Sequence, residues 1–323
     1  SVAWALLLTS TLTGGVQAQH RAEEEAASGA EADAGVEAGA RVVAERRAEA
    51  EAFVAATRAG IARFHDRSAA IAAGYRRLGP SFPGMGEHWI HPGLIVRGAI
   101  SPASPAVLCY ADIDGRPRLV GAAHAFPLAR DAPLPPLPGG SAVWHVHDGA
   151  VDEEALLLIH RDAGRGSSGT RLVMTHVWSE LENADGVFAQ NNWALPFLQA
   201  GLSLAGAPDM RAAQALSLLT AGPEYYQELF AAIAQPDAAE QLAIAQALTR
   251  TRSRVHAWHT ARTGAVGAPG AAGVDRNTAV SAAELAVLAG FWTDLWEQLE
   301  RNLSSATAAS LRAYRGGEHD RHR

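Results

Sequence analysis

The stretch "AVLCYADIDGRPRLVGAAHAF" at residues 106–126 constrains the fold most strongly. Two apolar runs flank Asp114 and Gly115, and an Asp-Gly pair in that position favours the tight turn of an antiparallel hairpin. The segments "SAVWHVH" (141–147) and "TRLVMTHVWSE" (170–180) have the same strand-like character. The sequence therefore predicts a small, mostly antiparallel sheet in the middle of the chain.

Helical patterns lie on both sides of this predicted sheet. Between residues 41 and 78, apolar side chains recur at helical spacing, and "GPSFPG" (79–84) follows as an end signal. From about residue 187 onward, alanine-rich segments again carry apolar residues at helical spacing. We expect an α+β fold with a long N-terminal helix, a small mostly antiparallel sheet and a helical C-terminal region.

The first residues have the pattern of an export signal. An apolar run from Val2 to Leu12 precedes Val16-Gln17-Ala18, which is a small-x-small cleavage motif. We expect residues 1–18 to be a signal peptide, and the mature protein to be periplasmic or secreted, soluble and without an integral membrane span. An uncleaved anchor is the alternative, but the run is too short to cross ~30 Å of hydrocarbon.

Composition divides the rest of the chain. Residues 19–40 are acidic and rich in alanine and glycine, which is typical of a solvated linker. We expect an α+β domain at 41–200, a helical region at 201–315 and a polar tail at 316–323. The formal net charge is −7 and no basic stripe stands out, so nucleic acid is not an expected partner.

Cys109 is the only cysteine in the chain, so no internal disulfide can form. It lies in an apolar, strand-like run, where we expect a buried structural thiol. A nucleophilic role is the alternative. The sequence contains no C-x-x-C, no H-E-x-x-H and no G-x-S-x-G motif, so no reaction is assigned by motif.

His145 and His147, in "WHVHDG", are two residues apart on a predicted strand. Residues at that spacing point to the same face of a strand, with Cα atoms roughly 6.6 Å apart. Two imidazoles placed in this way can reach one metal ion. The same spacing also fits two exposed strand histidines beside a turn.

Two further histidines occur in short, distinctive motifs of the same part of the chain. His88 lies in "PGMGEHWIHP", which predicts a glycine-punctuated loop of the kind that carries binding residues. His176 lies between apolar residues of a predicted strand, as either a metal ligand or a core histidine bonded to a carbonyl. Glu180 and Glu182 follow closely and are candidates for a carboxylate ligand or general base.

The stretches "ARFHDRSAAIAAGYRRLG", "PGMGEHWIHPGLI" and "THVWSELENADGVFAQNNWALPF" resemble a group of uncharacterised bacterial exported proteins. The resemblance covers about residues 60–198. Where that group has Glu in a "V-E-Y" strand, this chain has Ala123 and His124, so His124 or His147 would replace that carboxylate. The resemblance marks His65, Asp66, Tyr75, His88, His176, Trp178, Phe188 and Trp193.

Two functions fit these observations. In the first, a metal-dependent enzyme or metal-binding protein holds zinc, iron, copper or manganese with His88, His145, His147 and His176, next to a small-molecule ligand. In the second, a non-catalytic periplasmic module or subunit contacts a protein partner through its C-terminal helices, and the histidines are structural. Exposed aromatic residues on those helices would favour the second function.

Overall fold

The computed structural model describes residues 41–138, 140, 143–147, 170–264 and 278–321, without the side chains of residues 147, 170 and 315–321. The expected signal peptide and linker, at residues 1–40, lie outside this part. The chain divides into two units, residues 1–52 and 53–323. In the first unit, residues 41–52 are helical and, apart from Ala50, exposed, with ion pairs between side chains four positions apart.

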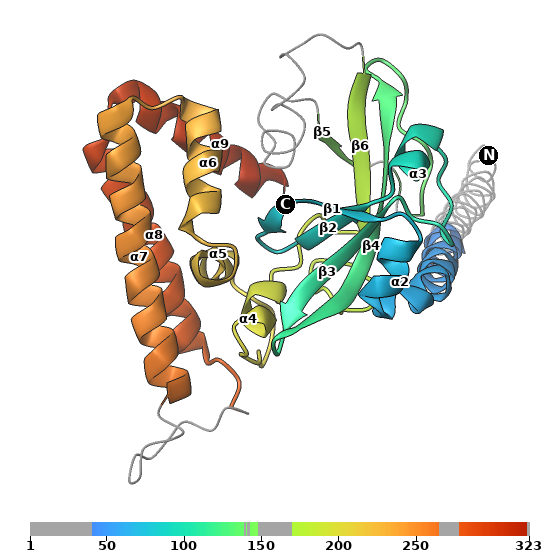
Figure 1. Ribbon diagram of the computed structural model, residues 1–323, viewed down its shortest axis with the longest axis horizontal. Coiled ribbons are helices and arrows are strands. Elements are labelled where there is room, and N and C mark those ends of the chain that lie inside the picture. Colours follow the sequence, from blue (N-terminus) through green and yellow to red (C-terminus); the bar gives the residue numbers. More distant parts are fainter. Residues whose placement is uncertain (1–40, 139, 141–142, 148–169, 265–277, 322–323) are drawn as a thin grey trace, which may run out of the picture. The chain divides into compact units, whose positions relative to one another are not determined.

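An antiparallel six-stranded sheet organises the second unit, in the order β1-β2-β3-β4-β6-β5 (Figure 1). The expected α+β class is confirmed by this sheet together with the helices before and after it. The strands are β1 (Arg76–Phe82), β2 (Gly86–Ile90), β3 (Val107–Ile113), β4 (Arg116–Ala129), β5 (His145–His147) and β6 (Thr170–Val177).

The hairpin predicted from the Asp-Gly pair is present between β3 and β4. Asp114 has φ 56° and Gly115 has φ 69°. Positive φ at both central residues is the conformation of a type I′ turn, whose twist matches that of the flanking strands. The local turn chemistry therefore fixes this pairing.

The long N-terminal helix is present, but the expectation that it continues to residue 78 is wrong. Helical residues end at 61 and are followed by η1 (Ala62–His65) and α2 (Arg67–Ala72). Asp66 interrupts the run, because its side chain accepts a hydrogen bond from the Ser68 backbone and caps a new helix. Gly74, at φ 98°, then redirects the chain into β1, so the segment "GPSFPG" belongs largely to a strand.

The C-terminal region is helical, as expected. After α3 (Pro92–Arg97), which follows β2, the helices are α4 (Leu195–Gln199), α5 (Met210–Thr220), α6 (Pro223–Ala234), α7 (Ala238–Gly264), α8 (Ala282–Asn302) and α9 (Ser305–Arg321). α9 includes most of the segment 316–323 that composition marks as a polar tail. Among the described residues, none of these helices combines the length and apolar character needed to cross a bilayer.

The two faces of the sheet contribute to separate apolar clusters. One face, here called the histidine face, carries Cys109, Met174 and Trp178 and packs against Leu195 of α4. The opposite face, here called the helix-covered face, packs Leu108 and Tyr110 against residues of the N-terminal helix, η1 and α2. Strand alternation therefore decides which environment each side chain enters.

Candidate metal centre

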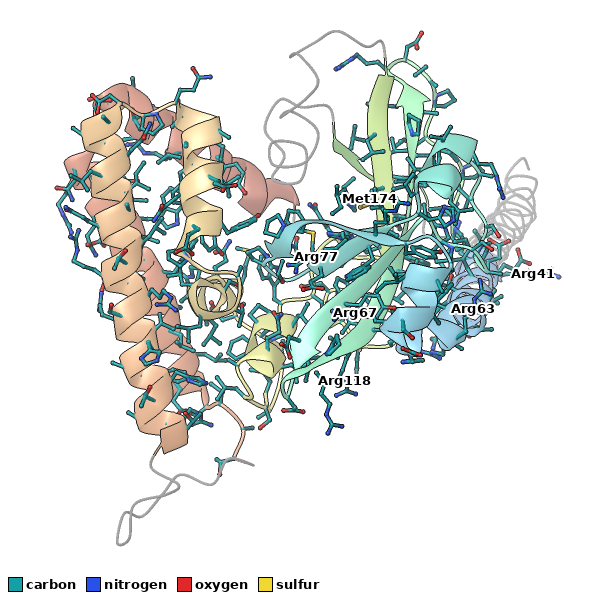
Figure 2. All side chains as sticks on the ribbon, in the orientation of Figure 1. Arg41, Arg63, Arg67, Arg77, Arg118 and Met174 are labelled. Atoms are coloured by element: carbon teal, nitrogen blue, oxygen red, sulfur yellow. The ribbon has the colours of Figure 1, made fainter. Side chains whose placement is uncertain are left out.

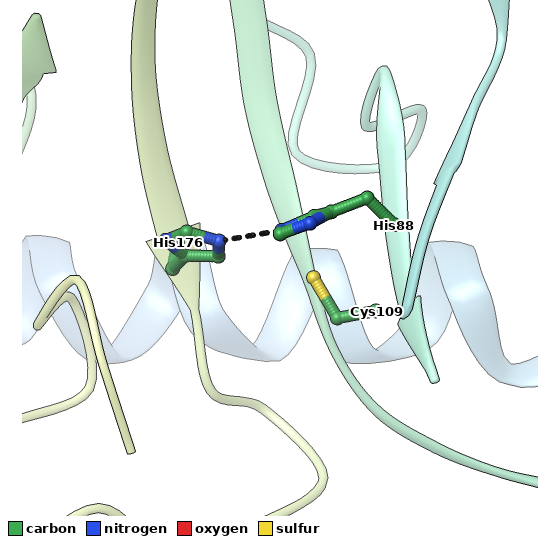
Figure 3. Close-up of side chains that lie close together, drawn as sticks. All are labelled: His88, Cys109 and His176. Carbon is green, nitrogen blue, oxygen red and sulfur yellow. Dashed lines mark hydrogen bonds between the residues drawn. The ribbon is translucent and has the colours of Figure 1, made fainter. Parts of the chain in front are cut away.

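Three side chains from three strands meet on the histidine face: His88 of β2, Cys109 of β3 and His176 of β6 (Figure 3). His88 and Cys109 are direct partners across the β2–β3 ladder, and side chains of such partners point to the same face. β4 runs between β3 and β6, where Gly121 is the partner of Cys109 and Ala123 is the partner of His176. The small side chain of Ala123 leaves room for the larger side chains of the neighbouring strands to meet, whereas Gly121 accommodates the Val177 carbonyl oxygen, which a Cβ there would meet at 2.7 Å.

The ligand atoms of the three residues lie within 4.8 Å of one another. The Nε2 atoms of His88 and His176 are 3.0 Å apart, and the sulfur of Cys109 points toward this pair (Figure 3). The exposed fractions of His88, Cys109 and His176 are 1%, 0% and 1%, so the group belongs to the core. Imidazole and thiolate are ligands that zinc, copper and iron accept.

Aromatic rings hold the two imidazoles in position. The ring of His176 stacks with those of His145 and Trp178, with centroid distances of 5.0 and 5.7 Å and interplanar angles of 8° and 19°. Trp178 is itself fixed, because its Nε1 donates to the Ala189 carbonyl at 2.7 Å. Phe82 packs on His88 with a centroid distance of 5.1 Å. Rotation of either imidazole is therefore restricted by its neighbours.

The turn before His88 depends on Gly86. Its φ is 76°, and a Cβ at this position would lie 2.3 Å from the Tyr110 carbonyl oxygen. Only glycine fits this close approach without a backbone shift. The same turn is tied to the segment before α4, since Asn191 Nδ2 donates to the Pro83 carbonyl and the Asn192 backbone donates to the Gly84 carbonyl.

Two of the four histidines expected as ligands, His88 and His176, come together. The expected loop around His88 is wrong, because this residue lies within β2. His145 stacks on His176 but does not join the group defined by the 4.8 Å limit. His147 is in β5, and its side chain lies outside the described part.

The two glutamates proposed as ligand or base lie elsewhere. Glu180 pairs with Arg58 at 3.6 Å and with His65 at 3.2 Å. Glu182 is exposed, and its backbone carbonyl accepts a hydrogen bond from Asn192. Neither carboxylate belongs to the His-Cys-His group found among the described residues.

Cys109 is the member of the group that sequence reasoning missed. It is fully buried, as expected for a structural thiol, but it lies next to two imidazoles. The strand-like run "AVLCYADI" predicts the burial of its side chain. The pairing of Cys109 with His88 depends on the β2–β3 register, which joins segments that no short motif connects.

His124, suggested by the resemblance as a replacement for a glutamate, lies on the opposite, helix-covered face. It is the direct partner of Thr175 across β4 and β6, and Phe53 packs on its ring at 5.3 Å. Burial lowers the pKa of His124 from 6.5 to about 4, because the charged form is desolvated. It therefore contributes nothing to the metal group.

Comparisons with protein-family models, with curated proteins and with solved structures gave no match for this chain.

Proposed function

We propose that this chain is a metal-binding protein that holds one transition-metal ion with His88, Cys109 and His176. The single observation that carries this proposal is the convergence of three soft or borderline donor atoms within 4.8 Å in the core. Three protein ligands are sufficient for a zinc ion whose fourth position is open, and trigonal His₂Cys sets occur in copper sites.

The spacing of the two imidazole nitrogens supports binding to a common ion. Two nitrogen ligands at ~2.05 Å from one ion, at a trigonal or tetrahedral angle, lie about 3.3–3.6 Å apart. His88 Nε2 and His176 Nε2 are 3.0 Å apart, so an outward adjustment of a few tenths of an ångström per ring brings both to ligand distance. Their arrangement is thus close to that of a bound site.

A hydrogen bond between two neutral imidazoles is the competing explanation of the same distance. In that arrangement one Nε2 donates and the other accepts, so the two rings are different tautomers. A metal ion would require both Nε2 atoms to be unprotonated. Cys109, whose thiol is not needed for the imidazole pair, is the residue that favours metal binding.

Burial of all three ligands favours binding over turnover of a substrate. A catalytic ion needs an open coordination position that a substrate can reach. The ligands are at most 1% exposed, and Glu180 and Glu182 are not part of the group.

The alternative of a docking module with exposed aromatic residues lacks support from the C-terminal helices. Tyr225, Tyr226, Trp292 and Trp296 are all buried, each at 4% exposure or less, and Trp258 is partly buried and packs against the same residues. They belong to one apolar cluster with residues from α5 to α9. These aromatic side chains therefore hold the helices to one another, and metal binding is the better supported function.

Export is part of the proposed function and is supported by the pattern of residues 1–18 alone. Expression in a bacterium, followed by mass spectrometry of the periplasmic fraction, tests it. We expect a product that begins after Ala18. Retention of an unprocessed chain in the cytoplasm would contradict export while leaving metal binding untouched.

Metal analysis of purified protein tests the site. We expect about one transition-metal ion per chain in the wild type, and less than about a tenth of that in Cys109→Ser. His256→Ala, at an exposed position on α7, is the matched control and should keep its metal. A wild type that binds no metal after incubation with zinc, copper and iron, while remaining folded by circular dichroism, would overturn the proposal.

A further inference from the structure

We infer that the metal ion is copper in its monovalent state. This inference rests on the proposed metal site and concerns its selectivity. One thiolate and two neutral imidazoles carry a total charge of −1, so a monovalent ion gives a neutral complex. A divalent ion with the same three ligands leaves a net charge of +1 in the core.

The surroundings of the site make that charge difference matter. The ligands lie among apolar and aromatic side chains, with Phe82 packed on His88 and Trp178 stacked on His176. A net charge in such an environment loses its hydration, which is unfavourable unless an opposite charge compensates it. Neutral complexes are therefore favoured at this position.

The neighbouring carboxylates already form ion pairs with basic side chains. Glu87 precedes His88, but strand alternation directs it to the opposite face, where it pairs with Arg77 at 3.2 Å and Arg67 at 3.6 Å. Figure 2 labels both arginines. Glu180 likewise pairs with Arg58 and His65. The group found among the described residues contains no carboxylate that could balance a divalent ion.

The type of donor favours copper and zinc over manganese. Thiolate is a soft ligand that selects Cu(I) and zinc, whereas manganese prefers oxygen ligands, so the choice between copper and zinc rests on the charge of the complex. Met174, labelled in Figure 2, lies two residues before His176 on β6 and belongs to the same buried cluster as Cys109. Zn(II) reaches neutrality here only by taking up an additional anion, such as hydroxide, from solvent.

Competition for the two ions tests the inference on the wild-type protein. Metal-free protein is titrated under anaerobic, reducing conditions against Cu(I) held by bicinchoninate, and separately against Zn(II) held by a chromogenic zinc chelator. We expect one Cu(I) per chain, bound on the order of 1000-fold or more tightly than Zn(II). Because Cys109 is the only cysteine, Cys109→Ser should lose this tight Cu(I) binding, and His256→Ala should keep it.

The possible results separate the two proposals. Equal or tighter binding of Zn(II), dependent on Cys109, would overturn the copper inference and leave the metal site standing. Failure of both ions to bind would overturn the inference, and failure of iron as well would overturn the proposed function. As an independent measurement, the copper-loaded protein should give no electron paramagnetic resonance signal, since Cu(I) is closed-shell. A Cu(II) signal from most of the bound copper would contradict the inference.

Discussion

The two faces of the sheet each bury histidine, but they do so in different ways. On the histidine face, His88 and His176 approach one another to 3.0 Å with a thiol beside them. On the helix-covered face, Phe53 packs on the ring of His124, whose Nε2 has no hydrogen-bond partner among the described atoms. Burial alone therefore does not create a candidate site, whereas convergence of donor atoms does.

The difference follows from the residues that β4 and β6 present. On the histidine face, β4 offers the small side chain of Ala123, over which larger side chains can meet. On the other face, His124 is opposite Thr175, whose hydroxyl also lacks a partner among the described atoms. A buried polar atom without a partner is unfavourable by about 1–3 kcal/mol. The histidine face thus brings ligand atoms together, whereas the helix-covered face buries two polar atoms without partners among the described atoms, which lowers the free energy of unfolding.

The largest expected effect is on metal affinity, which should fall when a histidine of the histidine face is replaced but not when His124 of the helix-covered face is replaced. His176→Ala removes one of three ligands and should weaken metal binding by at least 100-fold, about 2.7 kcal/mol. His124→Leu, on the opposite face, should leave the affinity within about twofold. Chelator competition on both variants measures this contrast. Equal weakening in the two variants would show that the histidine face is not the site.

The next effect is on the pH dependence of folding stability, to which His124 on the helix-covered face contributes. Burial lowers the pKa of His124 to about 4 from 6.5, so the unfolded chain binds a proton at a higher pH than the folded protein. His124 therefore destabilises the fold progressively as the pH falls from about 6.5 to about 4, and has no such effect above that range. Because of this group, the free energy of unfolding should be about 2 kcal/mol lower at pH 5 than at pH 8.

Chemical denaturation of wild type and His124→Leu at both pH values measures this contribution. The difference in unfolding free energy between the two proteins should change with pH by about that amount, in favour of the variant at pH 5. A difference that stays constant between pH 8 and pH 5 would contradict the neutral, buried state of His124.

A smaller effect is expected from the ring that stacks on His176. His145→Ala removes this packing without removing a ligand of the group, so metal affinity should fall about 5- to 10-fold, with one ion still bound per chain. Isothermal titration of the variant with the metal ion distinguishes a positioning role of His145 from a role as ligand. Loss of the bound ion itself would make His145 a ligand rather than a positioning residue.

The smallest effect concerns Glu180. Glu180→Gln removes ion pairs with side chains that are more than half exposed, so the unfolding free energy should fall by less than about 1 kcal/mol. Metal affinity should not change, because the carboxylate is not part of the group. A drop in affinity comparable to that of His176→Ala would restore Glu180 as a ligand.

Local chemistry allowed much of the fold to be predicted from the sequence. The Asp114-Gly115 pair identifies its hairpin, and the period of two along β6 places His176 on the same face as Met174 and Trp178. The helical C-terminal region follows from its apolar spacing. In each case the signal lies within a few residues of the structure that it specifies.

The rest depended on contacts that are distant in sequence. Gly84 and Gly86 indicate a loop, but they form a tight turn that lets β2 begin at Gly86, two residues before His88. Cys109 has no local feature that distinguishes a ligand from a core thiol. Its role depends on the β2–β3 register and on His176, which reaches the site across β4.

X-ray absorption spectroscopy of the metal-loaded wild-type protein tests the central claim most directly. If His88, Cys109 and His176 hold the ion together, the fine structure should require one sulfur at about 2.2–2.3 Å and two imidazole nitrogens at about 2.0–2.1 Å. A first coordination shell made only of oxygen and nitrogen, with no sulfur, would contradict the claim.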